Sequence, residues 1–306
     1  MTGDDSVLMN VMQKNLVARP VGVVSLLACL FLVAGHGVNS HSAEQNRQSA
    51  ATTKESELSK LFSEIAARSE LENAARLRSV TEGRLREFQG TTITQADIDA
   101  LVGLRDRLTS LLVIDCTIDD SQLQAISTLH NLRELNLAYS HTTDDNLHTL
   151  RALTNLTSLW LVSTRVTDRG LSNLSAFPLL NTLGLDSTAI TDKGLLTLGR
   201  IKTLTSLYIG SNSISDDGVT ALGSLVSLEN LRVNHNRRIT SRSIAAIAGL
   251  SRISFLQIDS TSVDDKCVDD LLKMTNLTFL HAANTGITED SLRRLRKELP
   301  RFERVP

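Results

Sequence analysis

Ser211, His235 and Asp259 have the residue types of a serine-hydrolase triad, and they follow one another at intervals of 24 residues. Serine catalysis also requires an oxyanion hole and a nucleophile held on a sharp turn, as in the motif G-x-S-x-G. The sequence around Ser211 is IGSNS, which lacks this motif. We therefore expect no catalytic residues, and a serine hydrolase is only a distant third interpretation.

Adjacent aspartates could in principle bind calcium, and they occur as five pairs: Asp119–Asp120, Asp144–Asp145, Asp216–Asp217, Asp264–Asp265 and Asp269–Asp270. Their spacing matches neither the loop of an EF-hand nor the nonapeptide of a calcium-binding β-helix. Four of the five pairs precede an apolar series at the same point of a repeat. At a helix N-terminus, such side chains accept backbone hydrogen bonds worth about 1 kcal/mol for each cap. The pairs therefore predict helix capping and no metal.

The composition excludes several other functions. With 32 basic and 34 acidic residues and a net charge of −2, the chain has no basic footprint for nucleic acid. Its three cysteines, Cys29, Cys116 and Cys267, lack metal-ligand spacing. The sequence also lacks a phosphate-binding loop, H-E-x-x-H and a dinucleotide fingerprint. We expect a protein that is not an enzyme and has no cofactor.

The elements that position these residues come from a 24-residue repeat, present in eight copies over residues 108–299. The copies begin at Leu108, Leu132, Leu156, Leu180, Leu204, Leu228, Ile253 and Leu277. Each contains L-x-x-L-x-L, a small polar residue at the ninth position, a Thr/Ser-Asp element and a second apolar series with helical spacing. Asn234 to Thr240 carries one additional residue, which we place in the turn after a strand. Residues 91–107 look like the helical half of a partial repeat.

These copies resemble the leucine-rich-repeat family, whose pattern L-x-x-L-x-L-x-x-[NCT]-x-[IL] covers about two thirds of the chain. The segments VTDRGL (166–171) and ITDKGL (190–195) look most like repeats of secreted and envelope proteins of planctomycete-type bacteria. The resemblance implies an α/β solenoid, or horseshoe, with short parallel strands on the concave face and helices on the convex face. Substrate receptors of ubiquitin ligases share the subtype, but Thr mostly replaces their Cys here, and no F-box-like module is recognisable.

Strand alternation predicts which side chains leave the core. The fourth and sixth positions, such as Leu159 and Leu161, point inward, whereas the third, fifth and seventh point to the concave face. The ninth-position polar residue is expected to bond to the backbone of adjacent turns. The fifth position of the eight copies reads Leu112, Asn136, Trp160, Gly184, Tyr208, Arg232, Gln257 and His281. The candidate ligand-binding residues are Trp160, Tyr208, Gly184, Asp186, Arg232, Tyr139, Phe255, Phe279, His281 and Asp259.

Trp160 and Tyr208 form the most distinctive part of this face. With strands about 4.8 Å apart, the two rings would stand about 10 Å apart across Gly184. That spacing predicts a slot for a flat apolar group of a ligand. Exposed aromatics within a broad interface, or rings packed on each other, are the alternatives. Arg232 could lie over the Tyr208 ring, reach Asp259 or recognise an acidic group of a partner.

The N-terminus predicts export. The apolar run Val21–Ala34 follows basic residues, is too short to span a bilayer and precedes small residues, so residues 1–40 read as a signal peptide or an N-terminal membrane anchor. Met12 is an alternative start. Residues 41–56 have a linker composition, and residues 57–90 have helical apolar spacing. Residues 300–306 are the C-terminal tail.

Together these features predict a monomeric, non-catalytic protein that is secreted, periplasmic or associated with the cell envelope. Its concave face would bind a protein or peptide, or alternatively a glycan, and it would bind no nucleic acid. A receptor or adaptor subunit is the alternative, in which the helical segment 57–90 couples a client to an effector instead of capping the repeats.

Overall fold

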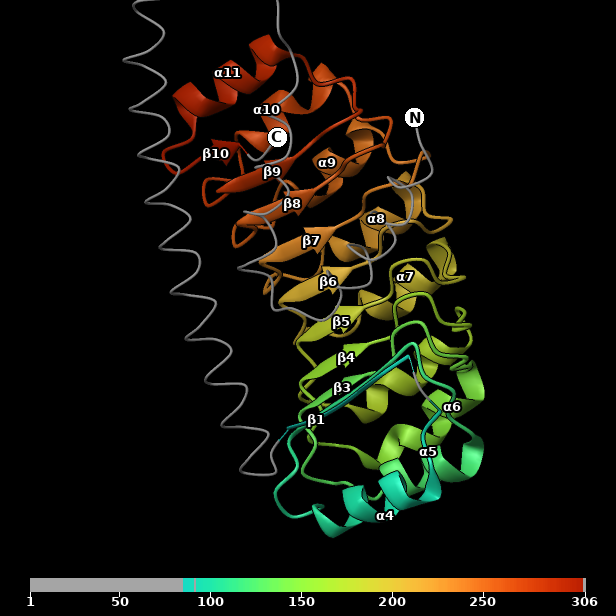
Figure 1. Cartoon of the computed structure of the whole chain (residues 1–306). Helices are drawn as coiled ribbons and strands as arrows, with labels where there is room; N and C mark the ends of the chain where they lie inside the picture. Colours follow the sequence, from blue (N-terminus) through green and yellow to red (C-terminus); the bar gives the residue numbers. More distant parts are fainter. Residues whose placement is uncertain (1–84, 91, 305–306) are drawn as a thin grey trace, which may run out of the picture. The chain divides into compact units, whose positions relative to one another are not determined.

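A single ten-stranded sheet runs through the computed structural model, which describes residues 85–90 and 92–304 (Figure 1). The strands lie side by side in chain order. They are β1 (Leu85–Gln89), β2 (Ser110–Ile114), β3 (Glu134–Asn136), β4 (Ser158–Trp160), β5 (Thr182–Gly184), β6 (Ser206–Tyr208), β7 (Asn230–Arg232), β8 (Phe255–Gln257), β9 (Phe279–His281) and β10 (Glu303–Arg304). All neighbouring pairs from β2 to β10 are parallel.

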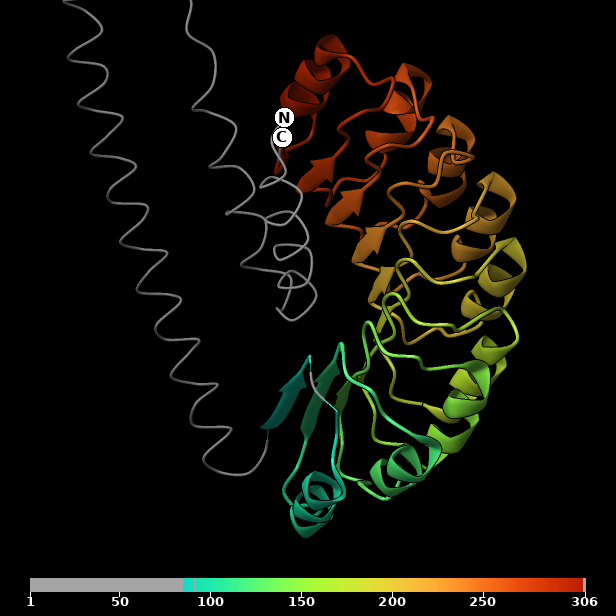
Figure 2. The ribbon, with the colours of Figure 1, turned by 45° about the vertical axis from the view of Figure 1, so that its right-hand side comes forward.

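Helices return the chain from each strand to the next along the opposite side of the described unit (Figure 2). The α-helices are α4 (Gln95–Gly103), α5 (Asp120–Ile126), α6 (Asp144–Thr149), α7 (Asp192–Leu198), α8 (Asp216–Leu222), α9 (Ser241–Ile247), α10 (Val268–Leu271) and α11 (Glu289–Glu298). The 3-10 helices are η1 (Leu150–Ala152), η2 (Gly170–Ala176) and η3 (Asp265–Cys267). Strands line the concave side and helices the convex side, so the predicted α/β solenoid is confirmed.

The core follows the predicted alternation. Leu135, Leu159 and Leu183 pair in register across β3, β4 and β5, and all three are fully buried. Leu161 at the sixth position is buried as well. Burying one such side chain is worth about 1.5–3 kcal/mol, and the same positions recur in every repeat. The solenoid is therefore held together by one continuous aliphatic core shared between neighbouring repeats.

The turn after each strand from β2 to β9 contains one residue, the eighth of the repeat, with a left-handed backbone conformation. The residues with φ between 53° and 61° are Asp115, Tyr139, Ser163, Ser187, Ser211, His235, Ser260 and Asn284. None is glycine, although this conformation costs other residues roughly 1–2 kcal/mol. The backbone N–H of this residue compensates in part, since it bonds to the next repeat, as from Ser187 to Gly210 O at 2.9 Å.

The ninth-position side chains bond to the backbone as expected, but mostly within their own turn. Thr164 Oγ1 donates to Leu161 O at 2.7 Å, and Cys116 Sγ contacts Ile114 O at 3.3 Å. The amides of Asn212 and Asn236 also reach the backbone of the preceding repeat. Asn236 Nδ2 donates to Ile209 O at 3.0 Å while its Oδ1 accepts from Asn212 N at 3.1 Å. Asparagine therefore adds a bond to the backbone of the preceding repeat, whereas the threonine hydroxyls bond to the backbone of their own turns.

The two ends of the sheet correct the predicted boundaries. Residues 85–89 form strand β1, not the end of a helix, because the segment joins the sheet edge and Gly90 N donates to Ile114 O at 3.0 Å. Phe88 packs against the core from this strand. The tail also contributes β10, which pairs with β9. The predicted signal, the linker and the rest of the 57–90 segment, up to residue 84, lie outside the described residues.

Two further expectations agree with the structure. The partial repeat contains α4, which begins after Thr94 with a reciprocal capping box to Asp97. The additional residue of the sixth repeat lies in the turn after β7, where Arg237 and Arg238 are both exposed. It does not disturb the sheet, since Leu231 still pairs with Leu256.

Candidate functional site

Trp160 leaves β4 on the concave face and leans over Gly184 onto Tyr208. The two rings are stacked, with centroids 5.2 Å apart and planes 21° apart. A Cβ at Gly184 would collide with Trp160 Cε3, so the observed position of the indole requires glycine here. The predicted open slot is therefore wrong, because the indole itself fills the space. The alternative in which the rings pack on each other is the one observed.

Arg232 covers the other side of the tyrosine. Its Cζ lies 4.8 Å from the centroid of the Tyr208 ring, which confirms the predicted position over that ring. The alternative, a contact with Asp259, is not the one observed. The Asp259 carboxylate instead accepts from Gln257 Nε2 at 2.7 Å and from Ala283 N at 2.8 Å. Trp160, Tyr208 and Arg232, here called the concave stack, thus form one column across β4 to β7.

Beside the stack, Asp186 and Asn234 converge over Gly210. Asp186 Oδ1 accepts from Gly210 N at 2.9 Å. A Cβ at Gly210 would meet both Asp186 Oδ1 and Asn234 Oδ1. The absence of a side chain therefore lets these two oxygens lie close to the Gly210 backbone. Burial raises the pKa of Asp186, although the charge of Arg232 and the Gly210 N–H act in the opposite direction. Burial likewise raises the pKa of Tyr208, whose hydroxyl therefore stays protonated at neutral pH.

The structure brings together only part of the predicted site. Trp160, Gly184, Tyr208, Asp186 and Arg232 lie in one group. Asn234 and Gly210 belong to the same group, although they were not among the predicted ligand-binding residues. The signal was available, because the seventh position of consecutive repeats reads Asp186, Gly210 and Asn234.

The other candidates lie elsewhere. Phe255 and His281 form a second aromatic contact towards the C-terminal end, with ring centroids 5.4 Å apart, and burial lowers the pKa of His281. Phe255 is almost fully buried, so it offers a ligand less surface than its outward position predicted, whereas Phe279 is half-buried. Tyr139 occupies the left-handed turn of an earlier repeat.

The three residues with hydrolase-like types do not form a triad. Ser211 and His235 are exposed residues of the left-handed turns, and their backbone amides donate to the next repeat. The Asp259 carboxylate is bound to Gln257 and Ala283, and no hydrogen bond joins it to His235. The arrangement supplies no aligned nucleophile and base.

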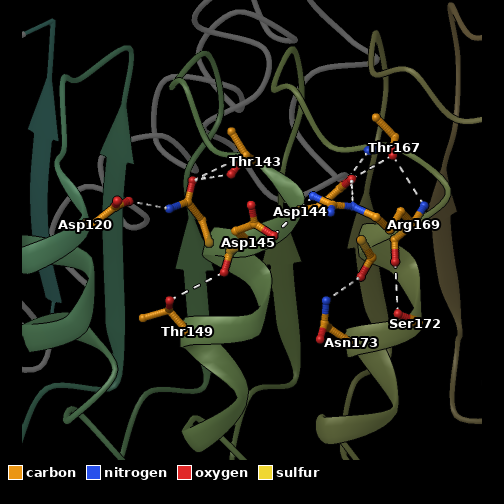
Figure 3. Close-up of polar contacts among 11 residues, drawn as sticks. Asp120, Thr143, Asp144, Asp145, Thr149, Thr167, Arg169, Ser172 and Asn173 are labelled. Atoms are coloured by element: carbon orange, nitrogen blue, oxygen red, sulfur yellow. Dashed lines mark hydrogen bonds and ion pairs between the residues drawn. The ribbon is translucent and has the colours of Figure 1, made fainter.

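The convex aspartates have a role that the sequence did not predict (Figure 3). Asp144 Oδ1 accepts from Thr167 N at 2.8 Å and its Oδ2 accepts from Thr167 Oγ1 at 2.7 Å, in the next repeat. Arg169 Nε adds a third contact, at 3.1 Å. The same two-bond link joins Asp168 to Thr191, Asp192 to Ser215 and Asp216 to Thr240. These links form a ladder of aspartates along the helix N-termini.

This ladder corrects the capping prediction in part. Asp119 and Asp264 do cap their helices, accepting from Gln122 N and Lys266 N respectively. Asp216 instead binds Thr240, the capping residue of the following repeat, and Asp144 binds Thr167, two residues before Arg169 at the start of η2. Burial by itself would raise the pKa of Asp144, but the hydrogen bonds from Thr167 and Arg169 outweigh it and hold the pKa below its ordinary value.

The glycine of the T-D-x-G element is explained by the same contact. A Cβ at Gly170 would collide with the Asp144 carboxylate, and one at Gly194 would collide with that of Asp168. In the sixth repeat Ser243 replaces this glycine and donates its hydroxyl to Asp216. Within the part of the chain that the structure describes, no group of three or more acidic, His or Cys side chains could hold a metal ion.

Comparison with known proteins agrees with this geometry. Residues 201–223 match the family model described as Leucine Rich repeat. The fold is a leucine-rich-repeat solenoid. An internalin (inlF) from Listeria monocytogenes has a similar structure, with TM-score 0.51 and 24% identity over 67% of this chain. Internalin C2 of the same organism gives TM-score 0.50 and 26% identity over 64% of this chain and 84% of its own.

The likeness to the internalins is a likeness of fold. The leucine-rich-repeat region matched here spans 62% of the inlF chain, less than two thirds of its length. A search of curated proteins found no significant match. Across residues 85–90 and 92–304, no helix has both the length and the apolar character that a bilayer crossing requires.

Proposed function

We propose that this leucine-rich-repeat protein is a non-catalytic binding protein whose concave face holds a protein partner outside the cytoplasm. Repeat solenoids use their extended concave surface in this way. The observation that carries the proposal is a contrast between the two faces. On the convex side, carboxylates and hydroxyls bond to each other from repeat to repeat. On the concave side, Trp160 and Arg232 remain partly accessible, and hydrogen-bonding groups beside them lack partners.

The concave stack has the composition of a binding hot spot. Hot spots are enriched in Trp, Tyr and Arg, and rigid aromatic groups lose little conformational entropy when they bind. Trp160 is fixed against Tyr208, and Arg232 is fixed over the same ring, so these side chains are already ordered before a partner arrives. Pre-ordered contact groups bind more tightly than flexible ones of equal area.

A selection experiment tests this proposal. A random peptide library displayed on phage is selected on the full chain, and the affinity of each enriched peptide is measured for Trp160→Ala and for Leu196→Ala. Leu196 is 58% exposed on helix α7 and serves as a matched convex control. We expect Trp160→Ala to weaken binding at least tenfold and Leu196→Ala to leave it unchanged. Peptides that bind both variants like the wild type would refute a concave site.

The location outside the cytoplasm is supported by the apolar run Val21–Ala34 and its basic flank. If the segment is a cleaved signal, the exported chain begins within or just after residues 34–40. Mass spectrometry of the N-terminal peptide from cell fractions tests this point. A chain that keeps its first residues and remains in the cytoplasmic fraction would contradict it.

A further inference from the structure

Every buried side-chain nitrogen or oxygen without a hydrogen-bond partner in the described ranges belongs to one place on the concave face. The three atoms are Tyr208 Oη, Arg232 Nε and Asn234 Oδ1; the Ser206 hydroxyl interacts electrostatically with Tyr208 but makes no hydrogen bond of ordinary geometry with its Oη. The three atoms come from β6, from β7 and from the turn directly after β7. An unpaired buried polar atom is unfavourable, and such atoms are rare in folded proteins. Three within two adjacent repeats indicate a place where an outside group completes the hydrogen bonding.

The polar cluster of Tyr208, Arg232, Asn234 and Asp186 offers donors and acceptors side by side. Arg232 Nε–H is a donor, and the Tyr208 hydroxyl can donate as well. Asn234 Oδ1 is an acceptor, and it lies over Gly210 beside the Asp186 carboxylate. A group that carries a carbonyl oxygen and an N–H would bond to the donors through its oxygen and to the acceptors through its N–H.

The charges of the cluster favour a neutral group. The charge of Arg232 acts to lower the pKa of Asp186, yet neither residue takes part in an ion pair in the described part of the chain. Asp259 lies one repeat beyond Asn234 in the same column. A partner carboxylate would therefore meet two acidic groups, and a partner cation would meet Arg232. Bringing an uncompensated charge into a half-buried site is unfavourable.

We propose that the polar cluster binds a neutral amide of a partner polypeptide, either the side chain of Asn or Gln or a backbone peptide group. The amide oxygen accepts from Arg232 and the Tyr208 hydroxyl, and the amide N–H donates to Asn234 Oδ1 or Asp186. The concave stack supplies the apolar contact beside it. This inference rests on the proposed function and specifies the chemistry of the same face.

The experiment uses the peptides selected on the full chain that lose affinity on Trp160→Ala. In each peptide, every Asn or Gln is replaced by its isosteric acid, and every backbone amide is N-methylated in turn. We expect one of these changes to weaken binding at least tenfold. The same change should have little effect on Arg232→Lys, which keeps the positive charge but loses the Nε–H donor and the planar fork. Arg237→Lys, an exposed change in the turn after β7, is the matched control.

Three results would overturn the inference while leaving the proposed function in place. They are tighter binding by the acidic peptide than by its amide, an affinity that falls steeply with ionic strength, and unchanged binding to Arg232→Lys. If no selected peptide loses affinity on Trp160→Ala, the proposed function fails first and the inference fails with it. Thermal unfolding of Arg232→Lys, expected to resemble that of wild type, separates loss of binding from loss of fold.

Discussion

Replacing Gly184 with alanine tests how the concave stack is built. The added Cβ would collide with Trp160 Cε3, so the indole must leave its position over β5 and separate from Tyr208. An aromatic stack is worth about 0.5–1.5 kcal/mol. Forcing a methyl group into a packed site costs about 1–3 kcal/mol in total. We therefore expect Gly184→Ala to lower the free energy of unfolding by about 1–3 kcal/mol.

The chain provides its own reporter for this change. Trp160 is the single tryptophan of the sequence, so tryptophan emission reports only on the stack. In Gly184→Ala we expect a red-shifted emission from a more exposed indole and a lower denaturation midpoint. Gly249→Ala is the matched control, because its Cβ would have no neighbour within 4 Å. A Gly184→Ala protein with the stability and the emission of the control would refute the stacked geometry.

Three further predictions concern groups around the site and the ladder. Because burial raises the pKa of Asp186, the folded chain holds that proton more tightly than the unfolded chain, so ionisation costs stability as the pH rises above 3.8. In urea unfolding at pH 7, the free energy of unfolding of Asp186→Asn should therefore exceed that of wild type, and the difference should disappear in acid. Equal free energies of unfolding at pH 7 would count against this reasoning. The pKa of Asp144 is lowered, so its stabilisation is complete above 3.8 and disappears as the pH falls through the folded pKa. Asp144→Asn should therefore cost about 1–3 kcal/mol at pH 7 and less in acid, whereas Asp145→Asn, whose carboxylate is exposed, should cost under about 0.5 kcal/mol. Burial raises the pKa of Cys267 to about 12, so almost no reactive thiolate is present at pH 8. Iodoacetamide should therefore leave Cys267 of the native chain unalkylated at that pH. Rapid labelling would show that the core around Cys267 opens to solvent.

The repeat period alone could predict most of the fold. A leucine every 24 residues indicates which strands pair and in which register, and Leu135, Leu159 and Leu183 pair as that spacing requires. It also indicates that Trp160 points outward from the core. Strand β1 could not be predicted in this way, because Leu85 and Phe88 have helical spacing, and only pairing with the sheet makes the segment a strand.

The site was less predictable, because spacing locates backbones and not side chains. Strand separation placed Trp160 and Tyr208 about 10 Å apart, but the missing Cβ of Gly184 lets the indole lean across and close the gap. The missing Cβ of Gly210 likewise leaves room for Asp186 Oδ1 and Asn234 Oδ1, which would both collide with that atom. The aspartate ladder was overlooked because capping explained each Asp within its own repeat, whereas the observed bonds to Thr167 and Thr191 cross to the next one.

Hydroxyl-radical footprinting of the full chain, with and without a peptide selected on it, tests the central claim most directly. The readout is the oxidation rate of individual side chains. If the concave stack is the contact surface, the peptide slows the oxidation of Trp160 and leaves Leu196 and Val226, which are 58% and 67% exposed, unchanged. Protection of Leu196 or Val226, with Trp160 oxidised as fast as in the free protein, would contradict the account.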